Sequence, residues 1–520
     1  MPADIGYNFR LKFQALPAEI FELAVSFLPN RDIKNIRLTC KALYERAHLR
    51  LRRVFLSANP RNIEVLRTIA DHERFRRDIV EIIWDDVQLV DHIPEQGEGM
   101  WNLDRALPPE GVPAWFDQVC WWNIEKFLRK QQRDPDLPIE DCWAYYQQLL
   151  QQQQDVLASE ADIEALRYGL QRFPALRRII ITPAAHGILD HPLYETPMIR
   201  AFPPGFNYPI LHAYPRLDDF DYSNLHIWPL PDKGLIPYIV PPWDQEGEKL
   251  KWRSFCLITR ELARIHDHQI SELVIDPHVL ETGLNCRIFD APCEEYNNIV
   301  TLLRRPGFER IDLALICDGQ YYNDQTWSSF RSGHLRRALR QASDLKHVSL
   351  RTCIDYSQVE DGSLPQSMQY TQHFVPLQTV LPIEKWQKLR HFGLSGFLVR
   401  SDDLISALSA LPRTLRSIEL SFLSFTGERA NWHDLFTDMR STLDWHERPT
   451  GERPLLRVHV PTVGLIRYCC LDKAANEFFY GDGANPFADY GHRLDPLPGK
   501  GIDRDPYPFR STDIAVERLD

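Results

Sequence analysis

One short pattern of apolar positions recurs along most of the chain. It consists of an apolar residue, two residues of any kind, and then two apolar residues separated by one position. It occurs eight times, as Ile79-Ile82-Trp84, Leu176-Ile179-Ile181, Ile270-Leu273-Ile275, Phe308-Ile311-Leu313, Leu345-Val348-Leu350, Leu389-Phe392-Leu394, Leu415-Ile418-Leu420 and Leu455-Val458-Val460. Each occurrence has the alternation of a short strand with one buried face. The pattern therefore predicts eight strands.

Segments with helical periodicity separate these strands. They are RNIEVLRTIADHERF, ADIEALRYGLQRF, WRSFCLITRELARIH, EEYNNIVTLLRR, FRSGHLRRALRQ, DDLISALSAL and HDLFTDMRSTL. Strands joined through helices lie parallel, with the helices outside the sheet. The strand pattern resembles a degenerate leucine-rich repeat, although most of its spacings exceed the 20 to 29 residues of regular repeats. We expect an α/β fold: an irregular leucine-rich-repeat-like horseshoe with parallel strands and outer helices. A doubly wound sheet is the alternative.

The N-terminal segment has a different pattern, which predicts three short helices in about forty residues. In LPAEIFELAVSFL one apolar stripe contains Ile20, Leu23, Ala24, Phe27 and Leu28, and Pro29 ends the helix. A second helix starts with Asp32 as its cap. The third lies in TCKALYERAH, with Thr39 as a possible cap. So small a segment cannot bury a core alone, so its apolar surface either meets a partner or packs on the rest of the chain.

The string LPAEIFELAVSFLPNRDIKNIRLTCKALYE resembles the F-box, with Ala24 and Tyr44 as departures from the usual pattern. The resemblance implies three helices that bind a Skp1-like adaptor and, through it, a cullin. It assigns the adaptor-binding surface to Leu16, Pro17, Ile20, Leu23, Leu28, Ile33, Leu38 and Lys41. It also implies that Phe27 holds the helices together. The basic run from Arg46 to Arg53 either complements an acidic adaptor or forms a solvated face.

These patterns divide the chain into an N-terminal tail (1–13), the F-box-like segment (14–57), the repeat-like array (58–471) and a partly disordered C-terminal tail (472–520). Insertions at about 91–154 and 191–243 interrupt the array. The first is rich in tryptophan, and its Gln151–Gln154 run is expected on a solvated helix. The second is rich in proline and aromatic residues, so we expect a folded loop, either a target-binding element or a structural lid. We expect Phe478, Phe479 and Tyr480 to anchor the start of the tail.

Composition and charge narrow the classes of function. The 520-residue chain has a formal net charge of -12, which disfavours nucleic acid as a partner. No run of about 18 apolar residues predicts a membrane span, and no signal peptide is recognisable, so we expect an intracellular protein. The ten cysteines form no CxxC pair. Buried structural thiols are favoured over metal sites at Cys469–Cys470 and at Cys286 with Cys293.

Motifs of catalysis are absent from the sequence. It contains no nucleophile elbow, phosphate loop, dinucleotide fingerprint or zinc-protease helix. The run His266–His268 is expected to be an exposed helix end, and the acidic run Asp218–Asp221 is expected to be hydrated. We therefore predict no catalytic residue, cofactor or metal. The F-box resemblance implies the substrate-recognition subunit of a Skp1–cullin–F-box ubiquitin ligase, binding an unknown target protein. The alternatives are a Skp1-bound scaffold and a hydrolase with an unrecognised site.

Overall fold

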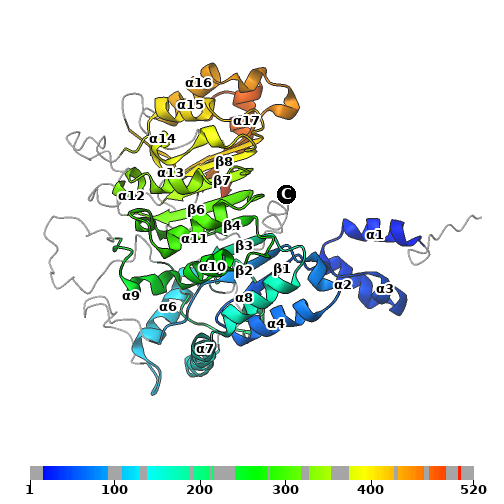
Figure 1. The fold of residues 1–520 in the computed structure, drawn as a ribbon. Coiled ribbons are helices and arrows are strands. Elements are labelled where there is room, and N and C mark those ends of the chain that lie inside the picture. The colour runs from blue at the N-terminus through cyan, green and yellow to red at the C-terminus, as the bar shows by residue number, and fades with distance from the viewer. Residues whose placement is uncertain are drawn as a thin grey trace, which may run out of the picture.

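The computed structural model is a mixed α/β fold around one 12-stranded, mostly parallel sheet (Figure 1). It describes residues 16–91, 108–128, 137–187, 189, 191–210, 214, 240–278, 282–317, 327–352, 374–426, 431–461, 468–487 and 502–504. Asp218–Asp221, residues 1–13 and most of the second insertion lie outside the described residues.

The parallel strands of the sheet follow one another in the order of the sequence. They are β1 (Arg53–Leu56), β2 (Glu81–Asp85), β3 (Arg178–Thr182), β4 (Glu272–Ile275), β6 (Arg310–Ile316), β7 (His347–Thr352), β8 (His391–Ser395), β10 (Ser417–Ser421) and β12 (Leu455–Pro461). The antiparallel β13 (Tyr468–Cys470) and β14 (Ile502–Arg504) extend the sheet beyond β12. A doubly wound sheet reverses its strand order at a switch point, and the strands of the described residues show no such reversal.

Three short strands lie outside that sequence of parallel neighbours. β5 (Leu284–Asn285) pairs with β6 away from the main path. The pair β9 (Leu398–Val399) and β11 (Ser424–Phe425) forms a separate two-stranded sheet.

All eight strands predicted from the apolar pattern are present, and β1 is an additional one. Because β1 pairs with β2, the sheet begins inside the range 14–57 that the sequence assigned to the helical segment. The last predicted strand has a different register from the one expected. Leu456 pairs with Ile418, and Leu455 pairs with Ser417 and is 49% exposed. The inward position is therefore Leu456.

Helices precede most of the parallel strands and cover one face of the sheet (Figure 1). They are α4 (Pro60–Asp71), α5 (Phe75–Asp78), α8 (Ala161–Arg172), α10 (Arg253–Arg264), α11 (Glu294–Leu303), α12 (Trp327–Arg331), α13 (His334–Leu339), α14 (Leu377–Val380), α15 (Ser401–Ser409) and α16 (Trp432–Thr442). Ile82, Ile179, Leu273 and their counterparts in later strands pack against these helices in one continuous core. Burial of this face holds the stack together, since no single strand–helix unit can bury its own apolar surface.

Charged side chains form a row across the opposite face, at the first residue of successive strands. Arg53 pairs with Glu81 at 2.8 Å, and Arg178 lies between Glu81 at 3.2 Å and Glu272 at 2.6 Å. Arg310 follows, in register with Glu272. Opposite charges on neighbouring strands favour this register over a slipped one, because a slip by one residue would turn the charges into the core.

Asp312 continues the charged face on β6. His347 Nε2 lies 2.9 Å from Asp312 Oδ1, and Arg310 Nη2 lies 2.5 Å from Asp312 Oδ2. Burial alone would raise the pKa of Asp312, but the charges of His347 and Arg310 outweigh it, and that pKa is lowered. His347 also stacks on His391 at 4.0 Å between ring centroids. Burial, followed by the charge of His347, lowers the pKa of His391 well below its usual value.

The two insertions pack on each other in a satellite core. α6 (Ala114–Leu128) and α7 (Ile139–Ser159) of the first insertion supply Trp115, Phe116 and Tyr146, and the second supplies Phe206 and Tyr208. The short helix α9 (Glu246–Lys249) follows the second insertion. The Gln151–Gln154 run is only partly solvated. Gln153 is buried and holds the backbone of Leu89 through two hydrogen bonds of 2.8 and 2.9 Å.

The fold continues beyond residue 471. Helix α17 (Asp472–Tyr480) packs beside β12, and Phe478 and Phe479 are buried against Phe436 of α16. These contacts place residues 472–487 with the array and agree with the anchoring role expected of the aromatic residues.

Candidate functional site

The N-terminal helices form a small unit with a core of its own. They are α1 (Ala18–Ser26), α2 (Asn30–Thr39) and α3 (Lys41–Arg46), and they lie beyond the β1 end of the sheet (Figure 1). Their core consists of Phe21, Val25, Ile33, Leu43 and Ala47. This cluster is separate from the core of the sheet, so the unit is folded by few apolar contacts.

Prolines and short caps determine where these helices begin and end. Pro17 precedes α1, and Pro29 separates α1 from α2 because its ring fixes φ and removes a donor. α2 begins at Asn30, so Asp32 lies in the first turn, where its charge complements the helix dipole, and does not cap the helix. Thr39 belongs to the end of α2, where its hydroxyl donates to the Ile36 carbonyl at 2.7 Å. It is therefore not the cap of α3.

Large apolar side chains are exposed on this unit. The exposed fractions are 50% for Ile20, 56% for Leu23, 79% for Phe27, 84% for Leu38 and 56% for Tyr44. In the part of the chain that the structure describes, only Leu250 and Leu455 are comparable large apolar residues elsewhere. Five such residues within 25 positions form what we call the N-terminal apolar face, defined as Ile20, Leu23, Phe27, Leu38 and Tyr44.

The structure separates the predicted adaptor-binding residues into three groups. Five are exposed (Pro17, Ile20, Leu23, Leu38 and Lys41), and two are half-buried (Leu16 and Leu28). Ile33 is fully buried in the core of the unit, so it cannot contact a partner and must be removed from the set. Phe27 was expected to hold the helices together, but its exposure shows that it does not.

The residues that do hold α1 in place were missed by the sequence analysis. Phe21 and Val25 are buried, and they lie four positions apart on the side of α1 next to the predicted stripe. Their i, i+4 spacing is itself a signal of one helix face. Because α1 has apolar residues almost all around it, the sequence contains two overlapping stripes, and periodicity cannot tell which one faces inward.

Three arginines of the basic run from Arg46 to Arg53 form contacts within the chain. The guanidinium of Arg46 donates to the Leu16 carbonyl at 2.8 Å and lies over the Phe21 ring. Arg50 donates to the carbonyl groups of Ser26 and Leu28, which accept at the C-terminal end of α1. Arg53 is engaged with Glu81 of the sheet. These arginines therefore bind backbone and sheet groups of their own chain.

A second candidate surface lies on the face of the sheet opposite the helices. Towards the N-terminal strands, Leu193 and Tyr194 of the second insertion cover Ile83, Ile180 and Val274. Towards the C-terminal strands the same face carries polar and small side chains, which we call the polar sheet face. Its members are His347, Ser349, Arg351, His391, Ser395, Ser417, Glu419, Ser421, Arg457 and His459.

Two other candidates from the sequence are structural. His268 is buried rather than exposed, and its ring bridges the Leu262 carbonyl and the Ile270 amide. Cys293 accepts the Tyr296 amide at the start of α11, so it serves as a helix cap.

Comparisons with known proteins give no family for the chain. Neither models of protein families nor curated protein sequences match it. Within the described residues, none of the helices has the length and apolar character needed to span a bilayer.

Proposed function

We propose that this protein is the substrate-recognition subunit of a Skp1–cullin–F-box ubiquitin ligase, and that the N-terminal apolar face binds a Skp1-like adaptor. The observation that carries the proposal is the concentration of exposed Ile20, Leu23, Phe27, Leu38 and Tyr44 on one small helical unit. Several large apolar side chains that one small unit leaves in water indicate an interaction site. The F-box-like order of residues from Leu16 to Glu45 supports the choice of adaptor.

Charge supports the same choice of partner. Residues 14–57 contain eight Lys or Arg and four Asp or Glu, whereas the whole chain has a net charge of -12. Lys41 is exposed beside Leu38 and Tyr44. Arg46, Arg50 and Arg53 are engaged within the chain. Arg31, Lys34 and Lys41 are exposed on the unit, and exposed basic groups favour an acidic partner and speed its encounter with the chain.

The exposed area is large enough to matter for affinity. Burying one Leu or Phe side chain contributes roughly 1.5–3 kcal/mol relative to leaving it exposed. Since about 1.4 kcal/mol is a tenfold change in Kd, each apolar residue of the face is expected to contribute about tenfold.

We further propose that the sequential parallel strands form a leucine-rich-repeat-like horseshoe whose polar sheet face binds the target protein. The strand order supports this, because each strand neighbours the next in the sequence. His391 and Glu419 on this face offer hydrogen-bonding groups that helices do not cover. The chain then acts by holding a target near the active sites of other subunits, and no residue of its own is catalytic.

The test is capture of a purified Skp1-like adaptor by the full chain. Leu23→Glu together with Leu38→Glu places charges on the apolar face and is expected to weaken capture at least 100-fold. Leu250→Glu is the matched control, because Leu250 is 67% exposed and lies outside the unit. It is expected to leave capture unchanged, and circular dichroism should show the same folded state in all variants.

Equal capture by the double variant and the native chain would refute the assigned surface. Co-purification of a cullin separates a ligase subunit from an adaptor-bound scaffold. A chain that captures the adaptor, but no cullin through it, would be a scaffold.

A further inference from the structure

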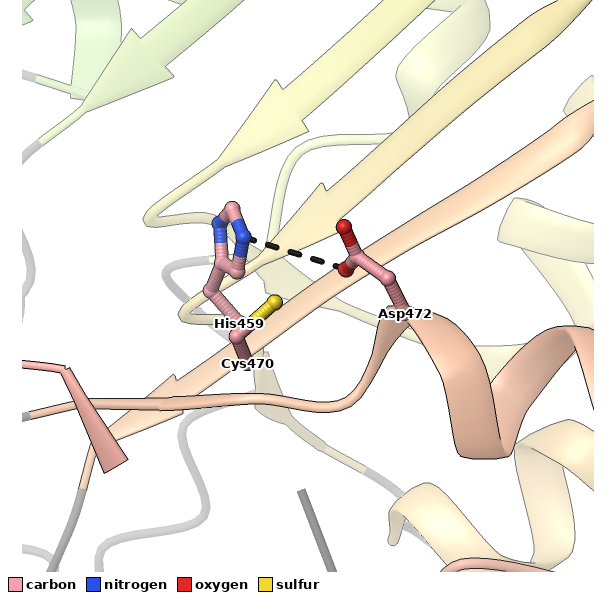
Figure 2. A group of neighbouring side chains, drawn as sticks. All are labelled: His459, Cys470 and Asp472. Atoms are coloured by element: carbon pink, nitrogen blue, oxygen red, sulfur yellow. Dashed lines mark ion pairs between the residues drawn. The ribbon is translucent and has the colours of Figure 1, made fainter. Parts of the chain in front are cut away.

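Three potential metal ligands converge at the C-terminal end of the sheet. His459 of β12 is directly opposite Cys470 of β13 in the antiparallel pair, and Asp472 begins α17 two residues later. Their ligand atoms all lie within 4.8 Å of one another. Figure 2 shows the imidazole, the thiol and the carboxylate turned towards one shared space.

The local fold explains why these side chains meet. β13 ends at Cys470, whose neighbours Cys469 and Leu471 are buried in the core, and at Leu471 the chain turns directly into α17, which brings Asp472 next to Cys470. The Val458 amide donates to Asp472 Oδ1 at 2.9 Å, and the Leu471 amide donates to the Val458 carbonyl. The carboxylate is therefore held in place from the backbone of β12.

We propose that His459, Cys470 and Asp472 bind one Zn²⁺ ion. Imidazole, thiolate and carboxylate are the ligands that zinc takes in proteins, with bonds of about 2.0–2.3 Å. Tetrahedral geometry with such bonds places ligand atoms roughly 3.5 Å apart. His459 Nε2 is 3.8 Å from Asp472 Oδ1, so small side-chain rotations close the site around an ion.

Groups behind the ligands orient the imidazole as zinc sites require. Ser421 Oγ lies 3.1 Å from His459 Nδ1, and the Ser421 hydroxyl donates to Glu419 Oε1 at 3.4 Å. The serine oxygen then accepts the proton of Nδ1–H, which leaves the lone pair of Nε2 facing Asp472. Such an outer hydrogen bond, fixing the tautomer of a ligating histidine, is a regular feature of zinc sites.

The site is partly open to solvent. The side chains of His459 and Asp472 are 20% and 35% exposed, so water reaches the side of the ion away from the protein. Cys470 is buried beneath them. Three protein ligands and one open position describe a site filled by water or by a group of a bound partner. The ion would also join β12, β13 and α17 at the end of the array.

Zinc binding by the purified full chain tests the proposal. The chain is stripped with EDTA, dialysed and titrated with ZnCl2 in a calorimeter, and Co²⁺ is used in parallel for its thiolate charge-transfer absorption. The native chain is expected to bind one equivalent, and Cys470→Ser is expected to lose the cobalt band and weaken zinc at least tenfold. Cys469→Ser is the matched control, because that neighbouring thiol packs in the sheet core.

A second pair of variants guards against loss of folding. His459→Gln is expected to weaken zinc as Cys470→Ser does, and Ser421→Ala by about tenfold, since outer groups typically contribute 10–100-fold. Thermal melts without metal show whether each variant is folded. If the native chain binds no zinc, or if the folded His459→Gln and Cys470→Ser variants bind it as tightly as the native chain does, the three residues form only an ion pair beside a buried thiol. This inference does not depend on adaptor binding.

Discussion

Ile33 and Leu38 lie on the same helix, α2, yet Ile33 is fully buried and Leu38 is 84% exposed. Ile33 packs inside the small core with Phe21 and Leu43, whereas Leu38 belongs to the N-terminal apolar face. One helix therefore serves two purposes, folding the unit and presenting a surface.

Truncating Ile33 is expected to change the stability of the helical unit, whereas truncating Leu38 is expected to change adaptor binding. Ile33→Ala should destabilise the helical unit by about 2–4 kcal/mol, because it removes buried methyl groups and leaves a cavity. Leu38→Ala should change stability by less than about 0.5 kcal/mol. Hydrogen exchange of the α1–α3 amides measures this local stability.

Among variants that remain folded, Leu38→Ala should weaken adaptor binding more than Ile33→Ala does. Leu38→Ala should weaken capture about tenfold at unchanged amide protection. Similar protection factors for the two alanine variants would contradict the assignment of Ile33 to the core.

Acid should destabilise the protein partly through His268. Its Nε2 donates to the Leu262 carbonyl at 2.9 Å and its Nδ1 accepts the Ile270 amide at 3.1 Å, so the bound ring is neutral. Burial first, and then the charge of Arg305, lower the pKa of His268 below its usual 6.5. As pH falls below about 6.5 the unfolded chain takes up a proton that the folded chain does not, so the free energy of unfolding decreases.

Denaturant unfolding between about pH 7.5 and pH 5.5 measures the effect. His268→Gln should reduce the loss of stability across this range, although His48 and His391 have pKa values lowered in the same direction and retain part of it. If the free energy of unfolding of His268→Gln falls with pH as steeply as that of the native chain, the neutral state of the His268 ring in the folded protein is contradicted.

Gly396 should tolerate no side chain. Its φ is +67°, and a Cβ built there would overlap the Thr352 carbonyl oxygen of the neighbouring strand. Gly396→Ala should cost at least about 2 kcal/mol, because strain and overlap add. Gly307→Ala is the control: its φ is +78° but its Cβ would meet open space, so the cost should stay near 1 kcal/mol. Equal melting temperatures for both variants would show that Thr352 moves freely.

Gln153 should join the first insertion to the array. Its amide pairs with both the N–H and the C=O of Leu89, and all of these groups are buried. Gln153→Ala leaves two backbone groups unpaired and should destabilise the protein by about 2–4 kcal/mol. Gln154→Ala, at an exposed neighbouring position, should have no measurable effect in the same urea unfolding experiment. An unchanged free energy of unfolding in Gln153→Ala would mean that water replaces the Gln153 amide at the Leu89 backbone.

The strands could be predicted from sequence because their signal is local. Around residues such as Ile82 and Leu273, apolar positions alternate with period two, and in the neighbouring helix they recur with period 3.6. Both patterns follow from burial of one face of the element. The register of β12 could not be predicted from sequence. Leu455 and Leu456 are both leucine, and only their pairing with Ser417 and Ile418 shows which one faces inward.

The candidate sites depend on contacts that periodicity does not contain. Phe21 in α1 and Phe27 directly after it have the same side chain, yet the first is buried and the second is exposed. His459 and Cys470 are too far apart in sequence for a compact metal motif, and they meet only because β12 and β13 pair antiparallel. Strand pairing of that kind is not encoded in any short window.

Because its parallel strands adjoin in the order in which they are synthesised, the sheet can grow by addition from β1 as the chain leaves the ribosome. Each new strand finds its hydrogen-bonding edge already in place, so no earlier strand has to wait for a distant later one. The antiparallel strands β13 and β14 then complete the sheet beyond the last parallel strand, β12. From β6 onward the connections between neighbouring strands are shorter than those around the two insertions, and contacts that are closer in sequence form faster than distant pairings.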